Sequence, residues 1–84
     1  KLDTKTRIDL RGKRAEESYK EIDDFINEAI LTSAEILTIV HGKGTGALRQ
    51  TIHNYLKDHP YVESYRLGEL VEGGAGVTIV KLKD

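Results

Sequence analysis

The sequence predicts an α/β domain, an α+β two-layer sandwich in which a four-stranded mixed sheet carries both helices on one face. The spacing of the apolar residues predicts strands and helices in the order β-α-β-α-β-β along the chain. Two right-handed crossovers in that order place both helices on the same side of the sheet. A length of 84 residues, 38% of them hydrophobic, allows one domain with a modest core. We expect residues 1–6 to be a terminus or linker and residues 7–84 to be the single domain.

The first half of the chain predicts a strand, a helix and a second strand. Residues 7–11 alternate between apolar and polar side chains, as in a short half-buried strand, and Gly12 ends the pattern. Apolar residues then recur every three or four positions from 14 to 31, which is typical of an amphipathic helix. The β-branched run 36–40 predicts an interior strand parallel to the first.

The second half predicts a helix over 46–58 with Thr45 as its N-cap, followed by two strands. These strands are expected over 61–67 and 77–82, where β-branched and aromatic residues are frequent. The glycine-rich segment 68–76 between them is expected to be a mobile loop close to the bound ligand.

Composition excludes several classes of protein. The chain has no Cys, so disulfides and thiolate metal sites are excluded. No apolar stretch approaches membrane length and no signal peptide is visible, so we expect no membrane partner and a cytoplasmic location. A net charge of −1 argues against a protein that simply coats nucleic acid. Six basic residues lie within 1–14 and seven acidic residues within 15–40, an asymmetry that would steer a polyanion toward one edge.

The strongest functional signal is the loop His41-Gly42-Lys43-Gly44-Thr45-Gly46, which joins a strand directly to a helix. Three alternating glycines allow backbone N–H groups to turn toward a common point, and the helix N-terminus adds unpaired donors. Phosphate fits such a site, and Lys43 and Arg49 could add positive charge. A tight turn without a ligand is the alternative, although one glycine would suffice for it.

Three side chains near this loop could carry chemistry. His41 ends an interior strand, where an imidazole could act as a general acid or base, contact phosphate, or simply hold the loop. Arg11 is suited to bidentate phosphate contact. Asp9 could orient His41, accept a proton or hold a divalent cation, or it could only pair with Arg11 on the sheet face. Because adjacent parallel strands would bring residues 9–11 beside His41, we expect one composite site.

The other two histidines give weaker signals. His53 follows Ile52 on the second helix and is expected to face solvent, and His59 precedes Pro60 in a turn. Their spacing matches no recognisable metal site, so both are interpreted as structural or surface residues.

Ile8-Asp9-Leu10-Arg11-Gly12 together with His41 to Arg49 resembles the two hallmark motifs of the Smr (small MutS-related) domain, in the version found at the C-terminus of MutS2 proteins. Gly73 to Thr78 is similar to the final glycine loop and strand of that family. The resemblance implies a nicking endonuclease of low sequence specificity, within a MutS2-like ATPase of DNA recombination and repair or of ribosome rescue. Other family members cleave messenger RNA, and the alternative is a non-catalytic module that binds nucleic acid or the ribosome.

The residues themselves, together with the resemblance, give the expected site residues and partners. The expected catalytic residues are Asp9, Arg11 and His41. The expected contacts to nucleic acid are Gly42, Lys43, Gly44, Thr45, Gly46, Arg49, Lys13 and Arg14. DNA or RNA is the expected partner, with the ribosome a further one, and Mg²⁺ or Mn²⁺ is the expected cofactor if a metal is used. The absent initiator Met predicts a fragment of a longer protein, which would form a homodimer through regions outside this chain.

Overall fold

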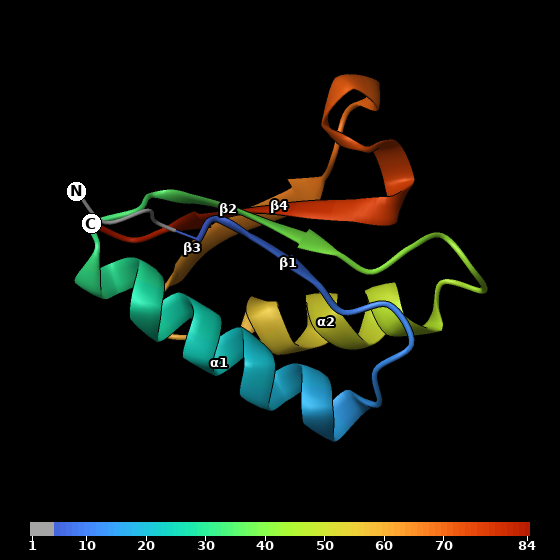
Figure 1. Ribbon diagram of the computed structural model, residues 1–84, viewed down its shortest axis with the longest axis horizontal. Helices are drawn as coiled ribbons and strands as arrows, with labels where there is room; N and C mark the ends of the chain where they lie inside the picture. Colours follow the sequence, from blue (N-terminus) through green and yellow to red (C-terminus); the bar gives the residue numbers. More distant parts are fainter. Residues whose placement is uncertain (1–4) are drawn as a thin grey trace.

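The computed structural model describes residues 5–84, in which a sheet lies over two helices (Figure 1). Of the expected terminus or linker 1–6, residues 1–4 lie outside the described part of the chain. The elements are β1 (Arg7–Asp9), α1 (Ala15–Leu31), β2 (Ile36–Val40), α2 (Ala47–Lys57), β3 (Val62–Leu67), the short 3₁₀ turns η1 (Leu70–Glu72) and η2 (Gly74–Gly76), and β4 (Val77–Leu82).

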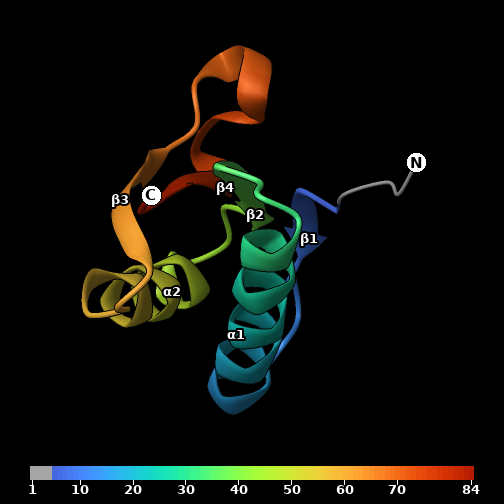
Figure 2. The same ribbon diagram turned by 90° about the vertical axis from the view of Figure 1, so that its left-hand side faces the viewer.

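The sheet has four strands in the order β1-β2-β4-β3. β1 pairs with β2 in parallel, with Asp9 opposite Val40, and β4 is antiparallel to both β2 and β3. Both helices lie on the same side of this sheet in the two views of the ribbon (Figures 1 and 2). The predicted mixed sheet with helices on one face is therefore confirmed.

The core lies between the sheet and the helices. Side chains of a strand alternate between its two faces, so the buried Ile8 and Leu10 place the intervening Asp9 on the opposite face. Full burial of an aliphatic side chain stabilises the fold by about 1.5–3 kcal/mol. The main buried contributors on the helix side are Leu10, Ile22, Phe25, Ile26, Leu37, Ile39, Ile52, Leu56 and Val80.

The opposite face of the sheet carries a second, smaller apolar cluster of Val40, Val77 and Ile79. The segment 68–76, which was expected to be a loop without regular structure, forms η1 and η2 and projects above this face (Figure 1). A Cβ atom placed on Gly73 would lie 2.8 Å from Cγ1 of Val77, so the turn packs closely on the cluster.

Element boundaries differ from the sequence predictions at two functionally important places. β1 ends at Asp9 rather than Arg11, although the N–H of Leu10 still donates to the carbonyl of Val40 at 2.7 Å. The N-cap of α2 is Gly46 rather than Thr45, because the chain enters the helix through a left-handed conformation with a φ of 86°. Thr45 instead accepts the N–H of Ala47 through Oγ1 at 3.3 Å. Neither helix within residues 5–84 has the length and apolarity needed to cross a membrane.

Candidate nucleic-acid interface

The glycine loop 42–46 lies at the end of the molecule where β2 leads into α2, beside the turn that follows β1 (Figure 1). It lines a hollow of about 310 Å³, with Gly12 and Lys13 contributed by the neighbouring turn. The expected phosphate-binding loop and the turn after the first strand therefore share one surface depression.

The backbone of this loop offers donors without protein acceptors. Gly42 and Gly46 have φ values of 78° and 86°, which side chains with a Cβ rarely adopt. The N–H groups of Lys43, Gly44 and Thr45 meet no hydrogen-bond acceptor in residues 5–84. Consecutive unpaired amides at a helix N-terminus form a site for an anion.

Two contacts fix the position of the loop. The N–H groups of His41 and Gly42 both donate to the carbonyl of Gly76, at 3.0 and 2.9 Å, which joins the loop to the turn before β4. A Cβ atom on Gly42 would lie 3.4 Å from Cγ and Cδ of Arg11. The aliphatic part of the Arg11 side chain therefore packs against the first glycine of the loop.

Asp9 holds the Arg11 side chain in place. Its carboxylate accepts hydrogen bonds from the backbone N–H, Nε and Nη2 of Arg11 at 2.6–3.1 Å. The hydrogen bonds from the Arg11 side chain contribute most, followed by the one from its backbone, and they lower the pKa of Asp9 to about 2. The carboxylate therefore stays ionised at neutral pH. Nη1 of Arg11 has no acceptor in the described part of the chain, and the side chain is 65% exposed. The guanidinium can therefore still bind an external anion.

His41 is buried, with 5% of its surface exposed, and both of its ring nitrogens lie within hydrogen-bond distance of protein atoms. Nδ1 lies 2.9 Å from the carbonyl oxygen of Gly42, and Nε2 lies 2.7 Å from Oγ1 of Thr78. A carbonyl oxygen can only accept, so Nδ1 carries the proton and the neutral ring accepts the Thr78 hydroxyl proton at Nε2.

The expectation that His53 faces solvent is wrong. It is half-buried, and its Nε2 lies 2.7 Å from the same Thr78 hydroxyl oxygen. Thr78 is fully buried between the two imidazoles and was not recognised as a site residue. The available sequence signal was a hydroxyl residue in line with Val80 and Leu82 on the inward face of the last strand.

The expected composite site is divided between the two faces of the sheet. Asp9 lies on the face opposite the helices, whereas His41 points to the helix side, where Thr78 connects it to His53 of α2. Asp9 therefore does not orient His41, because alternate side chains of neighbouring strands leave the sheet on opposite sides. Arg11 connects the two groups only through its packing on Gly42.

The remaining basic side chains differ in their freedom to bind an anion. Lys43 is exposed and makes no ion pair within residues 5–84. Lys13 is paired with Glu21 at 2.9 Å, and Arg14 precedes α1, where its N–H donates to Glu17. Arg49 folds back over the loop, because a Cβ atom on Gly46 would lie 2.8 Å from its Nη2.

Comparison with known proteins agrees with this arrangement, since residues 8–83 match the family described as the Smr domain. The chain belongs to the Smr domain family. The chain is 55% identical over 76 residues to an Endonuclease MutS2 of Clostridium botulinum and 48% identical over 77 residues to that of Caldicellulosiruptor bescii. These matches cover 90% and 92% of this chain, which spans about a tenth of the length of these curated relatives.

Solved structures show the same fold. The crystal structure of the Smr domain of Thermus thermophilus MutS2 matches with a TM-score of 0.89 and 42% identity, over 94% of this chain and 99% of that one. YdaL, a stand-alone small MutS-related protein from Escherichia coli, matches with a TM-score of 0.88 over all of this chain and 69% of that one. At 24% identity the second match concerns the fold alone.

The side chains around Asp9 do not fit a divalent cation. The carboxylate oxygens of Asp9 are already bound by Arg11. No group of three or more His, Asp or Glu side chains suited to a metal ion occurs within residues 5–84 of this Smr domain. Within residues 5–84 the protein alone therefore forms no ligand set for Mg²⁺ or Mn²⁺, and the use of a metal together with substrate phosphate stays a prediction.

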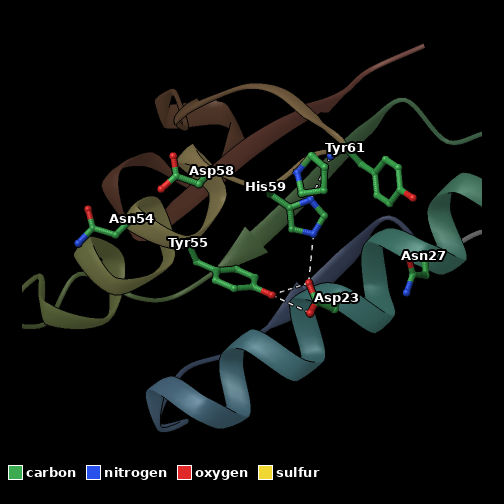
Figure 3. Close-up of a pocket in the computed structure, with 8 residues that line it drawn as sticks. Asp23, Asn27, Asn54, Tyr55, Asp58, His59 and Tyr61 are labelled. Carbon is green, nitrogen blue, oxygen red and sulfur yellow. Dashed lines mark hydrogen bonds and ion pairs between the residues drawn. The ribbon is translucent and has the colours of Figure 1, made fainter.

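A second hollow, of about 430 Å³, lies at the other end of α2 (Figure 3). Tyr55 donates its hydroxyl proton to Asp23 at 2.7 Å, and Nε2 of His59 lies 3.1 Å from the same carboxylate. Nδ1 of His59 accepts the N–H of Tyr61 at 3.2 Å, so neither ring nitrogen is free. The cluster is therefore a structural connection between the helices, and the interpretation of His59 as structural agrees with it.

Proposed function

We propose that this Smr domain binds the phosphodiester backbone of nucleic acid at the glycine loop and nicks it with low sequence specificity. The observation that carries the proposal is the convergence of three unpaired loop amides and the N-terminus of α2 on one hollow, with the Arg11 side chain packed against Gly42 at its edge. Backbone contacts of this kind position a nucleic acid without reading its bases, which accounts for low specificity. The word endonuclease in the names of the MutS2 relatives supports the cleavage step.

The phosphate is bound and its charge is stabilised by groups already in place. The amides of residues 43–45 donate to the non-bridging oxygens, and Lys43 and Nη1 of Arg11 neutralise their charge. Donors fixed before the reaction stabilise charge that develops on those oxygens during attack. Asp9 acts on Arg11 in this scheme, because it holds the guanidinium over Gly42.

His41 supplies the proton transfer. The proton on Nδ1, now bonded to the carbonyl of Gly42, is the imidazole proton nearest the loop. The doubly protonated ring transfers this proton to the leaving-group oxygen and becomes neutral, which makes His41 a general acid. Water on DNA, or a ribose 2′-OH on RNA, attacks the phosphorus as the nucleophile and releases its own proton to solvent. The proton assigned to Nδ1 favours the general-acid role over the general-base role, both of which the sequence allowed. No step requires a metal ion.

A plasmid-nicking assay with matched variants tests the proposal. Arg11→Gln removes the guanidinium beside the loop, whereas Lys57→Gln removes a charge at the other end of α2. We expect Arg11→Gln to slow nicking by about 10²-fold and Lys57→Gln to leave it unchanged. Equal rates in all three proteins would assign the nicking to a contaminant. DNA and RNA of the same sequence, each with and without EDTA, identify the substrate and any metal requirement.

A second candidate function is binding without cleavage, on nucleic acid or on the ribosome. The observation that favours it is the burial of His41 with both ring nitrogens occupied. It predicts salt-sensitive binding that survives His41→Gln, weakens in Arg11→Gln and produces no cut strand. The ATPase, the homodimer and the cytoplasmic location expected of the longer protein remain proposals, because this chain spans about a tenth of its relatives.

A further inference from the structure

Thr78 stands between two imidazoles whose ring centroids are 6.1 Å apart. Its hydroxyl oxygen lies 2.7 Å from Nε2 of His41 and 2.7 Å from Nε2 of His53. A hydroxyl donates one hydrogen bond and accepts others, so the two histidines cannot play the same part toward it.

The carbonyl of Gly42 fixes the donor-to-acceptor direction of every hydrogen bond in this series. Because Nδ1 of His41 must donate to that carbonyl, Nε2 of the neutral ring is an acceptor and takes the Thr78 hydroxyl proton. The Thr78 oxygen then accepts the Nε2 proton of His53. His53 therefore donates to Thr78, Thr78 to His41, and His41 to the carbonyl of Gly42. No buried polar atom of this hydrogen-bonded series lacks a partner.

We infer that His53 and Thr78 form a proton relay that connects the buried imidazole of His41, whose tautomer the Gly42 carbonyl sets, to the half-buried surface of α2. A proton bound at Nδ1 of His53 gives an imidazolium. Its Nε2 proton passes to Oγ1 of Thr78 while the Thr78 hydroxyl proton passes to Nε2 of His41. His53 is then neutral with its proton on Nδ1, and His41 carries the positive charge.

The surroundings of His53 oppose its protonation. Burial, followed by the positive charges of His41 and Arg49, lowers the pKa of His53. The groups placed against its ring are His41 at the end of β2, Arg49 on its own helix, Thr78 on β4 and Tyr65 on β3, whose ring centroid is 4.9 Å away. No carboxylate within residues 5–84 hydrogen-bonds either imidazole.

The catalytic use of the relay rests on the proposed function, but the hydrogen-bond chain does not. In nicking, the relay would supply the Nε2 proton that makes His41 an imidazolium, so that its Nδ1 proton can pass to the leaving group. Thr78 and His53 are then positioning residues that act through His41, since neither lines the hollow at the glycine loop.

Nitrogen-15 NMR of the 84-residue chain without nucleic acid tests the inference. Thr78→Val removes the hydroxyl at nearly unchanged shape, and Thr78→Ser is its matched control. His53→Gln keeps an amide donor near the position of Nε2 but cannot carry a proton onward. We expect wild type to show His41 protonated at Nδ1, a slowly exchanging Thr78 hydroxyl proton, and Nε2 signals of both rings that shift together during the first protonation.

The variants distinguish orientation from proton delivery. In His53→Gln, His41 keeps its tautomer but gains and loses protons about tenfold more slowly. In Thr78→Val, the two rings no longer shift together, and Thr78→Ser restores the wild-type pattern. A proton on Nε2 of His41 in wild type, or unchanged proton exchange in both His53→Gln and Thr78→Val, would overturn the inference. A protein without nicking activity but with this NMR pattern would refute the proposed cleavage alone.

Discussion

The carboxylates of Asp9 and Glu72 are each held by an arginine side chain and by a backbone N–H. Asp9 is bound by Arg11, whereas Glu72 is bound by Arg66 at 2.7 Å and by the N–H of Glu69 at 2.8 Å. The arginine hydrogen bonds are the largest cause of shifts that lower both pKa values to about 2. Both ion pairs hold a loop or turn next to the glycine-loop end of the sheet.

Neutralising these two carboxylates should reduce acid sensitivity. A lowered folded-state pKa adds stability that is fully present above the unfolded pKa and is lost as pH falls through the folded one. The free energy of unfolding of wild type should therefore fall between pH 4 and pH 2, from the ordinary values of 3.8 and 4.5 to the shifted values of about 2. In the double variant Asp9→Asn with Glu72→Gln, the free energy of unfolding, measured by urea titration, should fall less between pH 4 and pH 2.

A second double variant controls for the change in net charge. Glu35→Gln with Asp58→Asn also removes two carboxylates, but neither side chain makes an ion pair within residues 5–84. It should keep the acid sensitivity of wild type. Equally reduced acid sensitivity in both double variants would show that overall charge, rather than the arginine contacts, causes the effect.

At the same scale, sequence predicted the glycine loop and Arg11 but not Thr78 and His53. Gly42, Gly44 and Arg11 belong to contiguous motifs whose backbone geometry is local. The role of His53 depends on how α2 is rotated against the sheet, and a residue next to the core position Ile52 lies about 100° around the helix from it. That rotation is set by packing across the whole core, which periodicity alone does not specify.

At the scale of elements, α1 and the C-terminal end of α2 are joined by the Tyr55–Asp23–His59 cluster. Tyr19 stacks on Tyr55 with ring centroids 4.5 Å apart. Burial, followed by the hydrogen bond to Asp23, raises the pKa of Tyr55 to about 12, so its hydroxyl keeps the proton that it donates. The cluster therefore contributes to helix docking over the whole physiological pH range.

Tyr55→Phe should weaken this docking. The change removes one hydrogen bond to a charged acceptor and should lower the free energy of unfolding by about 1–2 kcal/mol in urea titrations. Tyr61→Phe is the matched control, because the Tyr61 hydroxyl makes no hydrogen bond to residues 5–84. A double-mutant cycle with Asp23→Asn should assign most of the loss to the pair, and additive losses would contradict it.

The helices and strands were predictable from periodicity, but the turns η1 and η2 were not. Residues 14–31 and 36–40 repeat their apolar positions often enough to distinguish helix from strand. The segment 68–76 has no such repeat, and its form depends on Val77 and on the pairing of Arg66 with Glu72. Contacts between distant residues give this segment its shape, so local pattern could not predict it.

At the scale of the whole molecule, exposed positively charged side chains lie at the loop end of the sheet. Arg11 and Lys43 are exposed there, whereas Lys13 is paired with Glu21 of α1. α1 carries six acidic residues and one basic residue, and it lies on the other side of the sheet from Asp9. The charge asymmetry expected from the sequence thus appears as a basic loop end of the sheet and an acidic outer face of α1.

This charge asymmetry predicts which lysines contribute to the salt dependence of nucleic-acid binding. Each phosphate contact releases counterions, so Lys43→Gln should lower the slope of log K against log salt by about 1. Lys57→Gln, at the far end of α2, should leave the slope unchanged, and Lys13→Gln should change it less than Lys43→Gln because Glu21 already holds that charge. Fluorescence anisotropy with one labelled duplex over a series of salt concentrations measures all three slopes. Equal reductions for Lys43 and Lys57 would mean that the polyanion is attracted by net charge alone, whereas a reduction confined to Lys43 places the backbone in the hollow beside the glycine loop.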